Sequence, residues 1–223
     1  MQLNGRQMDT IVYIDGFNLY HGSVKGTPYK WLDLGSLCAT LLPGRNIKKI
    51  RYFTAIVVDF PHDQQASTRQ DVYIRALRTV PNLEVHKDGW FSKNARMLPR
   101  YPLTYPDPTK PPMNVQVWKL EEKRTDVDIA THLLVDCFSG HFDEAVVISN
   151  DSDLVLPVEM VRTKYGKRVG VINPHHRDSM SSHLRKAASY HYRQINKSVL
   201  AKCQFPITLK DSAGRTITKP ASW

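Results

Sequence analysis

The sequence predicts an α/β fold in which helices cover both faces of a central, mainly parallel sheet. Short runs of β-branched and apolar residues alternate with segments of helical periodicity along the 223 residues. Such alternation is typical of parallel strands joined by crossover helices. With 41% hydrophobic and 23% charged residues, the chain is predicted to be globular, and its length suits one domain with an elaboration.

The expected elements follow from periodicity and from turn signals. Strands are predicted at residues 10–14, 48–58, 83–90, 115–120, 144–149 and 168–172, and helices at residues 31–42, 62–79, 125–138, 151–164 and 181–190. The first strand ends at Asp15-Gly16, which is a turn signal. Farther on, residues 206–210 and 215–219 flank a short polar segment and are predicted to form a β-hairpin.

One segment interrupts this alternation. Residues 98–113 contain six prolines, which exclude the interior of a helix or a sheet. We therefore expect a Pro-rich insertion within a domain that spans residues 8–192. Residues 193–223 are expected to form a basic C-terminal extension.

The positive charge of the chain is concentrated in its last third. The net charge is +10, but residues 162–223 hold 13 Lys and Arg against 2 Asp and Glu, whereas residues 1–161 hold 18 against 19. A basic segment beside a neutral body favours a polyanionic partner, and we expect it to hold the backbone of a nucleic acid. A solubilising basic tail is the plainer alternative.

The cysteines argue against a disulfide framework. Cys38, Cys137 and Cys203 are odd in number and widely spaced, unlike a disulfide scaffold or a zinc site. Free thiols are typical of a reducing compartment, so a cytoplasmic protein is expected. The sequence shows neither an apolar leader nor a run long enough to span a membrane, and no membrane partner is expected.

Acidic residues stand where strands end or helices begin. Asp15 follows the first strand, Asp126 and Asp128 begin a helix, and Asp151 and Asp153 follow a later strand. Ligands of parallel α/β sheets bind outside the carboxyl ends of the strands, so these carboxylates are expected to converge. Taken singly, each acid is better explained as a helix cap or as a partner of the helix dipole.

Helical phase separates acids that point inward from those that face solvent. Asp126 shares the apolar face of its helix, whereas Asp128 lies on the polar face. Asp151 likewise lies above an apolar stripe, and the phase of Asp153 is ambiguous. Asp15, Asp126 and Asp151 are therefore the expected metal ligands and catalytic residues, with Asp153 as a further ligand or an orienter of water.

A cluster of carboxylates implies a cation. Several carboxylates in one crevice repel one another unless a divalent ion neutralises them. Hard oxygen donors, without a cysteine or histidine cluster, favour Mg²⁺ or Mn²⁺ over zinc. Such an ion activates water and stabilises the charge that develops in phosphodiester cleavage.

The same segments resemble the NYN domain, particularly its LabA-like members, within the PIN-like nuclease superfamily. The matching pieces, in order, are YIDGFNLYH, KRTDVDIATHLL, VVISNDSDLVLPVEMVRTKYGKRVGVI and SHLRKAASYHY, and they extend over roughly residues 10–190. The resemblance implies a PIN-like three-layer α/β sandwich, an acidic Mg²⁺ or Mn²⁺ site and nuclease activity, with RNA as the favoured substrate.

The resemblance also assigns roles to residues. The acids of the family match Asp15, Asp126, Asp151 and Asp153. Asn18 matches the Asn of the family's Asp-Gly-x-Asn opening, where it shapes the site, and Ser149 matches the serine that leads into the last acidic turn. The chain departs from the family pattern at Asn150, where glycine is usual, and at His132, near a position where many members carry an acid.

Basic residues near the acids are candidates for binding substrate phosphates. Lys123 and Arg124 directly precede the helix that begins with an acidic turn, although a self-compensating charge run EEKR is an equal alternative. His175, His176 and Arg177 follow a strand at its carboxyl end. They are expected to contact a nucleic-acid backbone rather than a metal.

The sequence thus predicts metal-dependent hydrolysis of phosphodiester bonds, with single-stranded RNA as the expected partner. A non-catalytic nucleic-acid-binding regulatory module and a phosphoesterase of small substrates are the alternatives. The sequence contains no Gly-rich phosphate loop and no GxSxG turn, which disfavours dinucleotide enzymes, NTPases and α/β-hydrolases. The sequence does not decide between RNA and DNA as the substrate, or whether a homo-oligomer forms.

Overall fold

The computed structural model describes residues 7–59, 63–97, 115–175, 180–192 and 195–223. Its strands are β1 (Asp9–Asp15), β2 (Asn46–Ala55), β3 (Leu83–Met97), β4 (Val115–Lys123), β5 (Glu144–Ile148), β6 (Arg168–Ile172), β7 (Tyr190–Tyr192), β8 (Thr208–Lys210) and β9 (Thr216–Thr218). Its helices are α1 (Gly16–Leu19), the π-helix η1 (Tyr20–Val24), α2 (Leu34–Leu41), α3 (Ala66–Leu77), α4 (Thr125–Phe138), the 3₁₀-helix η2 (Ser152–Leu154), α5 (Val155–Thr163), α6 (Ser182–Ala187) and α7 (Lys197–Lys202).

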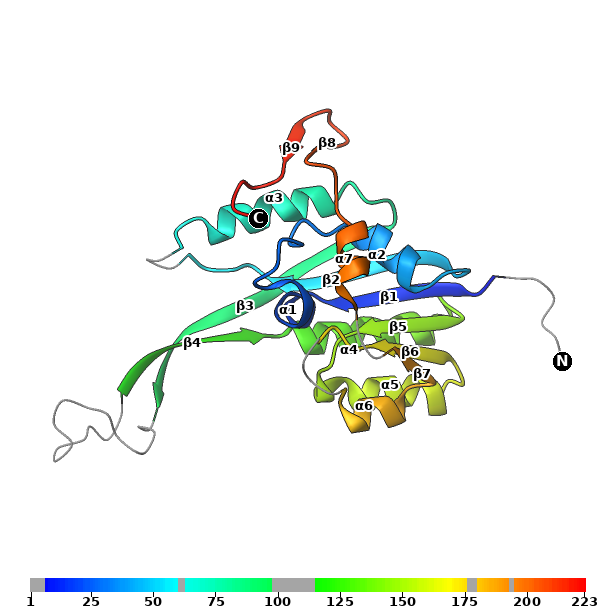
Figure 1. Cartoon of the computed structure of the whole chain (residues 1–223). Coiled ribbons are helices and arrows are strands. Elements are labelled where there is room, and N and C mark those ends of the chain that lie inside the picture. Colours follow the sequence, from blue (N-terminus) through cyan, green and yellow to red (C-terminus); the bar gives the residue numbers. More distant parts are fainter. Residues whose placement is uncertain (1–6, 60–62, 98–114, 176–179, 193–194) are drawn as a thin grey trace.

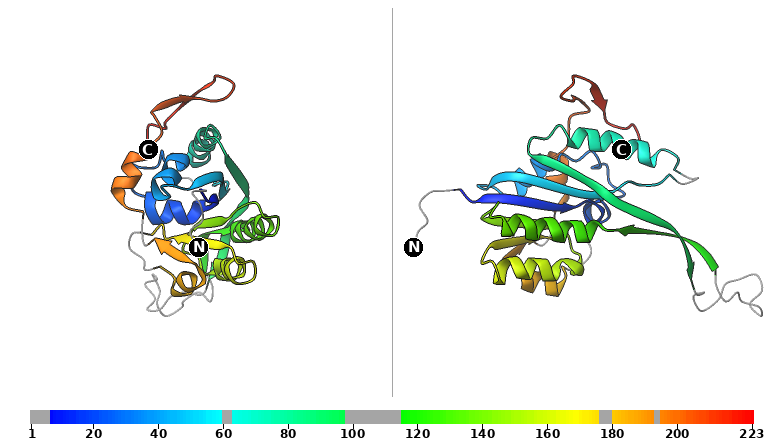
Figure 2. Two further views of the ribbon diagram at one scale, coloured as in Figure 1. Left: turned by 90° about the vertical axis from the view of Figure 1, so that its right-hand side faces the viewer. Right: turned by 180° about the vertical axis from the view of Figure 1, so that it is seen from behind.

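Within the described residues, the strands form a seven-stranded sheet in the order β4-β3-β2-β1-β5-β6-β7 and a separate hairpin of β8 and β9 (Figure 1). Neighbouring strands of the large sheet are parallel except β3 and β4, which are antiparallel. Helices α2, α3 and α7 pack on one face, and α4, α5 and α6 pack on the other (Figure 2). The predicted three-layer α/β fold with a mainly parallel sheet is therefore confirmed.

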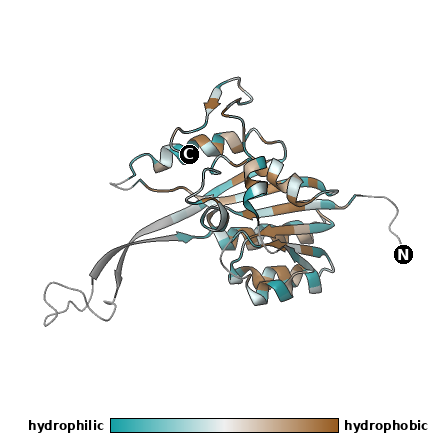
Figure 3. Cartoon of the chain, viewed as in Figure 1, coloured by the Kyte–Doolittle hydropathy of each residue, from teal (hydrophilic) through white to brown (hydrophobic). Residues whose placement is uncertain are grey.

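The central strand β1 shows why both faces are covered. Val12 and Ile14 belong to one buried cluster, whereas Ile11 and Tyr13 belong to the other. Successive side chains of a strand point to opposite faces, so a strand that is apolar at every position must be buried on both sides. Figure 3 shows the resulting apolar bands along the strands.

Two predicted helices differ from the structure. The helix expected at residues 181–190 ends at Ala187, and Tyr190 begins β7 instead. The ring of Tyr190 lies where a Cβ on Gly170 would be only 2.3 Å from it, so the edge strand packs closely on its neighbour. The helix expected at residues 151–164 begins as the 3₁₀ turn η2, because Asp151 caps that turn by accepting from the Asp153 N–H.

Other differences concern length. The helix expected at residues 31–42 begins at Leu34, because the Asp33 carboxylate accepts from the Gly35 and Ser36 N–H groups at 2.9 and 3.1 Å. The helix expected at residues 62–79 is shorter and corresponds to α3. Helices α1, η1 and α7 were not predicted, since segments of four to six residues are too short to show a helical period.

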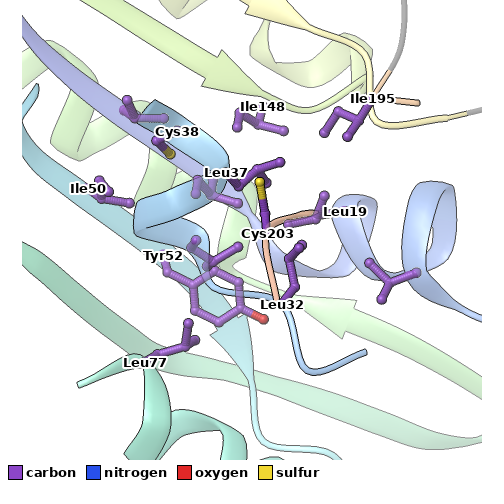
Figure 4. Packing of buried hydrophobic residues seen from close by; sticks show 14 of the residues in the cluster. Leu19, Leu32, Leu37, Cys38, Ile50, Tyr52, Leu77, Ile148, Ile195 and Cys203 are labelled. Atoms are coloured by element: carbon purple, nitrogen blue, oxygen red, sulfur yellow. The ribbon is translucent and has the colours of Figure 1, made fainter. Parts of the chain in front are cut away.

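Residues 195–223 belong to the same core as the sheet. Leu200 and Ile217 are almost fully buried in the cluster that contains α2 and α3, and the Trp31 indole donates to the Pro206 carbonyl at 2.8 Å. Figure 4 shows Cys203, from the same segment, packed against residues of α1, α2 and β2. The paired strands β8 and β9 lie inside the two segments predicted to form a hairpin.

The cysteines, the absence of a membrane-spanning run and the Pro-rich segment can each be compared with the structure. Cys38, Cys137 and Cys203 are buried and free. Across the described ranges, no helix is both long and apolar enough to cross a membrane. The predicted Pro-rich insertion at residues 98–113 lies outside the described residues.

A charged network is buried beneath α4. The Arg51 guanidinium donates to both oxygens of Asp136, at 2.8 and 2.9 Å, and the Tyr13 hydroxyl donates to the same carboxylate at 2.8 Å. Asp136 is only 2% exposed. Burial acts to raise the pKa of Asp136, but the hydrogen bonds from Arg51, His141 and Tyr13 outweigh it, so that the pKa is lowered.

We predict that Asp136→Asn destabilises the protein strongly, because it leaves the Arg51 guanidinium buried without its main counter-charge. The expected loss is about 3 kcal/mol, at the low end for a broken buried pair because Arg51 also contacts Glu84. Urea unfolding at pH 7 measures it. Asp128→Asn on the same helix is the matched control, since it removes an ion pair to the half-exposed Arg124 and should cost less than about 1 kcal/mol.

The same pair sets an acid limit on stability. A carboxyl whose folded-state pKa is lowered stabilises the protein above its unfolded-state pKa, and this stability is lost as pH falls through the folded-state pKa. The stability gap between wild type and Asp136→Asn should therefore be complete at neutral pH and shrink below the usual carboxyl range. A gap that stays constant down to strongly acidic pH would contradict the assignment.

Candidate active site

Four carboxylates gather at the carboxyl edge of the parallel strands. Asp15 ends β1, Glu122 lies at the end of β4, Asp126 is in the first turn of α4, and Asp151 is in the turn after β5. They line an open pocket of about 380 Å³, which we call the acidic pocket. Its other lining residues are Phe17, Asn18, Lys123 and Thr125.

Strand topology brings these segments together. Strands β1 and β5 are parallel neighbours in register, so the residues that follow Ile14 and Ile148 lie side by side. Strand β3 extends past the edge of the sheet, and β4 returns antiparallel to it until Glu122 pairs with Phe91. The end of β4 therefore reaches the same edge, although its sequence lies beyond the Pro-rich segment.

The Asp15 side chain is buried and held by hydrogen bonds. Its carboxylate is 2% exposed, and it accepts from the Asn18 N–H and from the Ser149 hydroxyl, both at 2.9 Å. A Cβ at Gly16 would lie 2.6 Å from the Phe53 carbonyl oxygen. Glycine is therefore required after Asp15, because no side chain fits where the chain leaves β1 against β2.

A second set of polar contacts joins the neighbouring loops. The Asn18 amide oxygen accepts from the Asn150 N–H at 3.3 Å and lies 3.0 Å from Nε2 of His175. The Ser149 hydroxyl also accepts from the Asp151 N–H at 3.1 Å. Asn18 and Ser149 thus hold three loops in place, and Ser149 is fully buried, so it contacts the acids rather than the open space of the pocket.

The carboxylates perturb one another. Burial, followed by the negative charges of Asp151, Asp15 and Asp153, raises the pKa of Asp126 to about 7. The pKa of Glu122 is also raised to about 7, by burial and by the charges of Asp15 and Asp126, although the Thr125 hydroxyl opposes the rise. Burial also raises the pKa of Asp15, against the hydrogen bonds that it accepts.

The remaining sequence candidates have different positions. Asp153 is exposed and does not line the acidic pocket, although its charge acts on Asp126. Lys123 lines the pocket, whereas Arg124 forms an ion pair with Asp128 at 3.1 Å. His175 contacts Asn18. His176 and Arg177 lie outside the described residues.

Glu122 is the site residue that sequence reasoning missed. It belongs to the run EEKR, for which a self-compensating charge segment and phosphate binding by Lys123 and Arg124 are equal explanations. The signal that would have found it is the placement of this run, at the end of a predicted strand and directly before the acidic helix start. Its role depends on the antiparallel return of β4, which periodicity does not reveal.

The departures of Asn150 and His132 from the family pattern also have a structural account. Asn150 is not among the described residues with positive φ, so its turn does not need glycine. Its side-chain oxygen accepts from the Ser181 N–H at 2.8 Å, at the start of α6. His132 packs against His86, with ring centroids 4.4 Å apart, and does not line the acidic pocket.

The donor set suits a hard divalent cation, but the pocket is not a closed cage. All four acids offer carboxylate oxygens, the ligands that Mg²⁺ and Mn²⁺ prefer. In the described parts of the chain, no group of three or more His, Cys, Asp or Glu side chains is arranged so that it could hold a metal ion. The fit is therefore to an ion held by one or two carboxylates and water, as is usual for Mg²⁺.

Part of the positive charge of the last third lies away from this pocket. Nε of Arg168 donates to Glu144 at 2.9 Å, and Nζ of Lys167 donates to the Phe142 carbonyl at 2.8 Å. Both contacts lie at the amino ends of β5 and β6, at the edge of the sheet opposite the acids. Their charge is used to hold the fold, so only part of the basic excess is available for a polyanion at the acidic pocket.

We predict that Asp126→Asn stabilises the metal-free protein at pH 8. Because the folded-state pKa, about 7, lies above the ordinary value of 3.8, this carboxyl contributes stability below pH 3.8 that is lost as pH rises through 7. Removing its charge should raise the free energy of unfolding by roughly 1–2 kcal/mol, less than the full shift implies because the pocket is open to solvent.

Urea unfolding in EDTA at pH 8 and pH 4 measures this effect, which should vanish at the lower pH. Glu159→Gln, which neutralises an exposed acid of α5, is the control. If both variants had the same stability at pH 8, the carboxylates of the acidic pocket would not repel one another as described.

Comparison with known proteins places this chain in a family. The model of the NYN domain matches residues 9–196. A curated relative, 6-hydroxy-3-succinoylpyridine 3-monooxygenase HspA of Pseudomonas putida, is 32% identical over all of this chain and 77% of its own length. A solved structure of a protein of unknown function from Vibrio parahaemolyticus is 18% identical, covers 88% of this chain and 98% of that chain, and shares the fold with a TM-score of 0.53. The chain therefore belongs to the NYN domain family, whose fold is of the PIN-like nuclease type.

Proposed function

We propose that the protein is a metal-dependent nuclease that hydrolyses phosphodiester bonds, with single-stranded RNA as its substrate. The observation that carries the proposal is the convergence of Asp15, Glu122, Asp126 and Asp151 on one open pocket. Carboxylates that raise one another's pKa at a sheet edge are costly for folding, and a site for a divalent cation accounts for that cost. Membership of the NYN family supports the same reaction class.

The residues of the pocket have separable tasks. Asp126 and Asp151 are open to the pocket and would hold Mg²⁺ or Mn²⁺ together with water, whereas Asp15 is buried behind them and would add its negative charge. When bound, the ion supplies Lewis-acid stabilisation of the phosphate and activates water. Ser149 and Asn18 keep the Asp15 carboxylate in one orientation, and Glu122 adds a fourth carboxylate.

Substrate binding follows from the charge beside the acids. Lys123 lines the pocket, and its positive charge would suit a phosphate of the polymer. RNA is favoured by the family and by the flexible backbone of single strands, which an open crevice can admit. The motifs YIDGFN and SNDSD support the LabA-like branch, and three buried free thiols support a cytoplasmic location.

A second candidate function comes from the curated relative. Its name describes a monooxygenase of a substituted pyridine, and a partly enclosed, mainly apolar pocket beside the acids has room for such a ring. A monooxygenase places one oxygen atom of O₂ in the substrate and reduces the other to water with two electrons from a reductant. Oxygen uptake with 6-hydroxy-3-succinoylpyridine and NADH, absent when either is omitted, would favour this candidate.

We predict that labelled single-stranded RNA is cleaved in Mn²⁺ or Mg²⁺ and not in EDTA. Asp126→Asn and Asp15→Asn should each lower the rate by roughly 100-fold or more, the scale on which a lost acid–base or electrostatic group acts. Asp128→Asn is the matched control on the same helix, since Asp128 is paired with Arg124 and its loss should leave the rate nearly unchanged. Single-stranded DNA, run in parallel, tests the preference for RNA.

The same variants separate the alternatives. Mn²⁺ should raise the Tm of the wild type and of Asp128→Asn, but not that of Asp126→Asn, which tests metal binding without activity. Salt-sensitive RNA binding without cleavage would instead support a binding module. Faster hydrolysis of a mononucleotide than of an oligonucleotide would support a small-substrate phosphoesterase. Cleavage that persists in both EDTA and Asp126→Asn would remove the acidic pocket from the reaction.

A further inference from the structure

A second pocket, of about 220 Å³, lies beside the acidic pocket and has no task in the proposed hydrolysis. We call it the ring pocket. Its walls come from α1 and η1, the end of β2, α3 and the tail that carries Trp223. Its volume is below the roughly 300–1,000 Å³ of sites for drug-sized ligands, so it suits one small ring system.

The inner wall of the ring pocket is apolar and aromatic. Leu19 and Leu32 are almost fully buried there, and Figure 4 shows them packed beside Tyr52. The Tyr73 ring meets the rings of Tyr52 and Trp223 at steep angles, with centroids 6.5 and 5.6 Å apart. The Tyr73 hydroxyl donates to the Leu32 carbonyl at 2.8 Å, which fixes this ring in place.

Polar groups border the same cavity, and most are already paired. Nη2 of Arg69 donates to Asp63, and the Gln70 amide donates to the Ala55 carbonyl at 2.8 Å and accepts from the Val57 N–H at 2.8 Å. Lys30 also lines the pocket, and no ion pair to it is found in the described part of the chain. Its ammonium is therefore available for an anionic group on a ligand.

The two pockets share a wall. Phe17 lines both, directly after the Asp15-Gly16 turn. Ala55 lines the ring pocket, and its backbone hydrogen-bonds to Glu122 of the acidic pocket. A ligand seated in the ring pocket therefore lies next to the carboxylates of the acidic pocket.

We propose that the ring pocket binds a planar heteroaromatic ring that carries an anionic substituent. The aromatic side chains provide faces for a flat ring, the polar border suits a ring with polar edge atoms, and Lys30 provides the positive charge. Two sources share this chemistry. One is a nucleotide, whose base is the ring and whose phosphate is the anionic substituent, which rests on the proposed nuclease function. The other is a free pyridine-type acid, which does not.

Titration calorimetry of the full chain tests this proposal with AMP, UMP and 6-hydroxy-3-succinoylpyridine as probes, with and without Mn²⁺. The blocking variant is Ala66→Trp, because Ala66 lines the pocket at the start of α3. Thr68→Trp is its matched control, on an exposed position of the same helix outside the lining. We expect at least one probe to bind the wild type. In Ala66→Trp the indole would occupy the space of the ligand's ring, so binding should weaken by roughly tenfold or more, the scale of one lost stacking contact. In Thr68→Trp binding should be unchanged.

A charge variant keeps the proposal testable if Ala66→Trp does not fold. Lys30→Gln should weaken the binding of the anionic probes, whereas Lys25→Gln, which neutralises an exposed lysine outside the lining, should not. Tighter binding of a nucleotide would assign the pocket to a nucleobase, and tighter binding of the pyridine acid would assign it to a free small molecule. Failure of all three probes to bind the wild type, or equal binding by each variant and its control, would overturn the proposal.

Failure of this proposal and failure of the nuclease proposal give different results. RNA cleavage that is lost in Asp126→Asn, together with equal KM and kcat in Ala66→Trp and Thr68→Trp and no binding of any probe, would leave the nuclease standing without a ring pocket. Probe binding that depends on Ala66 and Lys30, in a protein that cleaves no polymer, would keep the ring pocket and remove the nuclease.

Discussion

The burial of one carboxylate, that of Asp15, constrains the rest of the site. A charge that is only 2% exposed needs hydrogen bonds, and two come from the Asn18 N–H and the Ser149 hydroxyl. These donors lie on the loops after β1 and β5, which must therefore stay side by side. The glycine that follows Asp15 allows the chain to turn against β2 without a clash. The turn at Asp15-Gly16 therefore both connects β1 to α1 and positions the buried carboxylate of the site.

The sequence predicted the acids in β1, α4 and the β5 loop, because each stands at a boundary between an apolar run and a polar turn. The parallel register places Asp15 beside Ser149, two residues before Asp151, at the edge of the sheet where ligands of α/β folds bind. Asp126 was assigned to the inward face by helical phase, and it lines the pocket. Asp153, whose phase was ambiguous, is exposed outside the lining.

What the sequence did not predict depends on long-range pairing. Glu122 reaches the site only because β4 returns antiparallel along β3, and a charged run at the end of a strand has a simpler explanation in solvent. Likewise, Arg168 contributes to the basic excess of the last third, yet its partner Glu144 lies at the amino edge of the sheet. Net charge along a sequence does not tell on which side of a sheet that charge will lie.

The docking of residues 195–223 on the core has a consequence for when the ring pocket exists. Most of its wall comes from residues 16–73, but Trp223 closes one side, and Ile217 of the same tail is 1% exposed in the core. The pocket is therefore complete only after a segment more than a hundred residues away in sequence has docked. By thermodynamic linkage, a ligand that needs Trp223 must stabilise the docked tail. Undocking of the tail must lower the affinity for the ligand by the same factor by which the ligand favours docking.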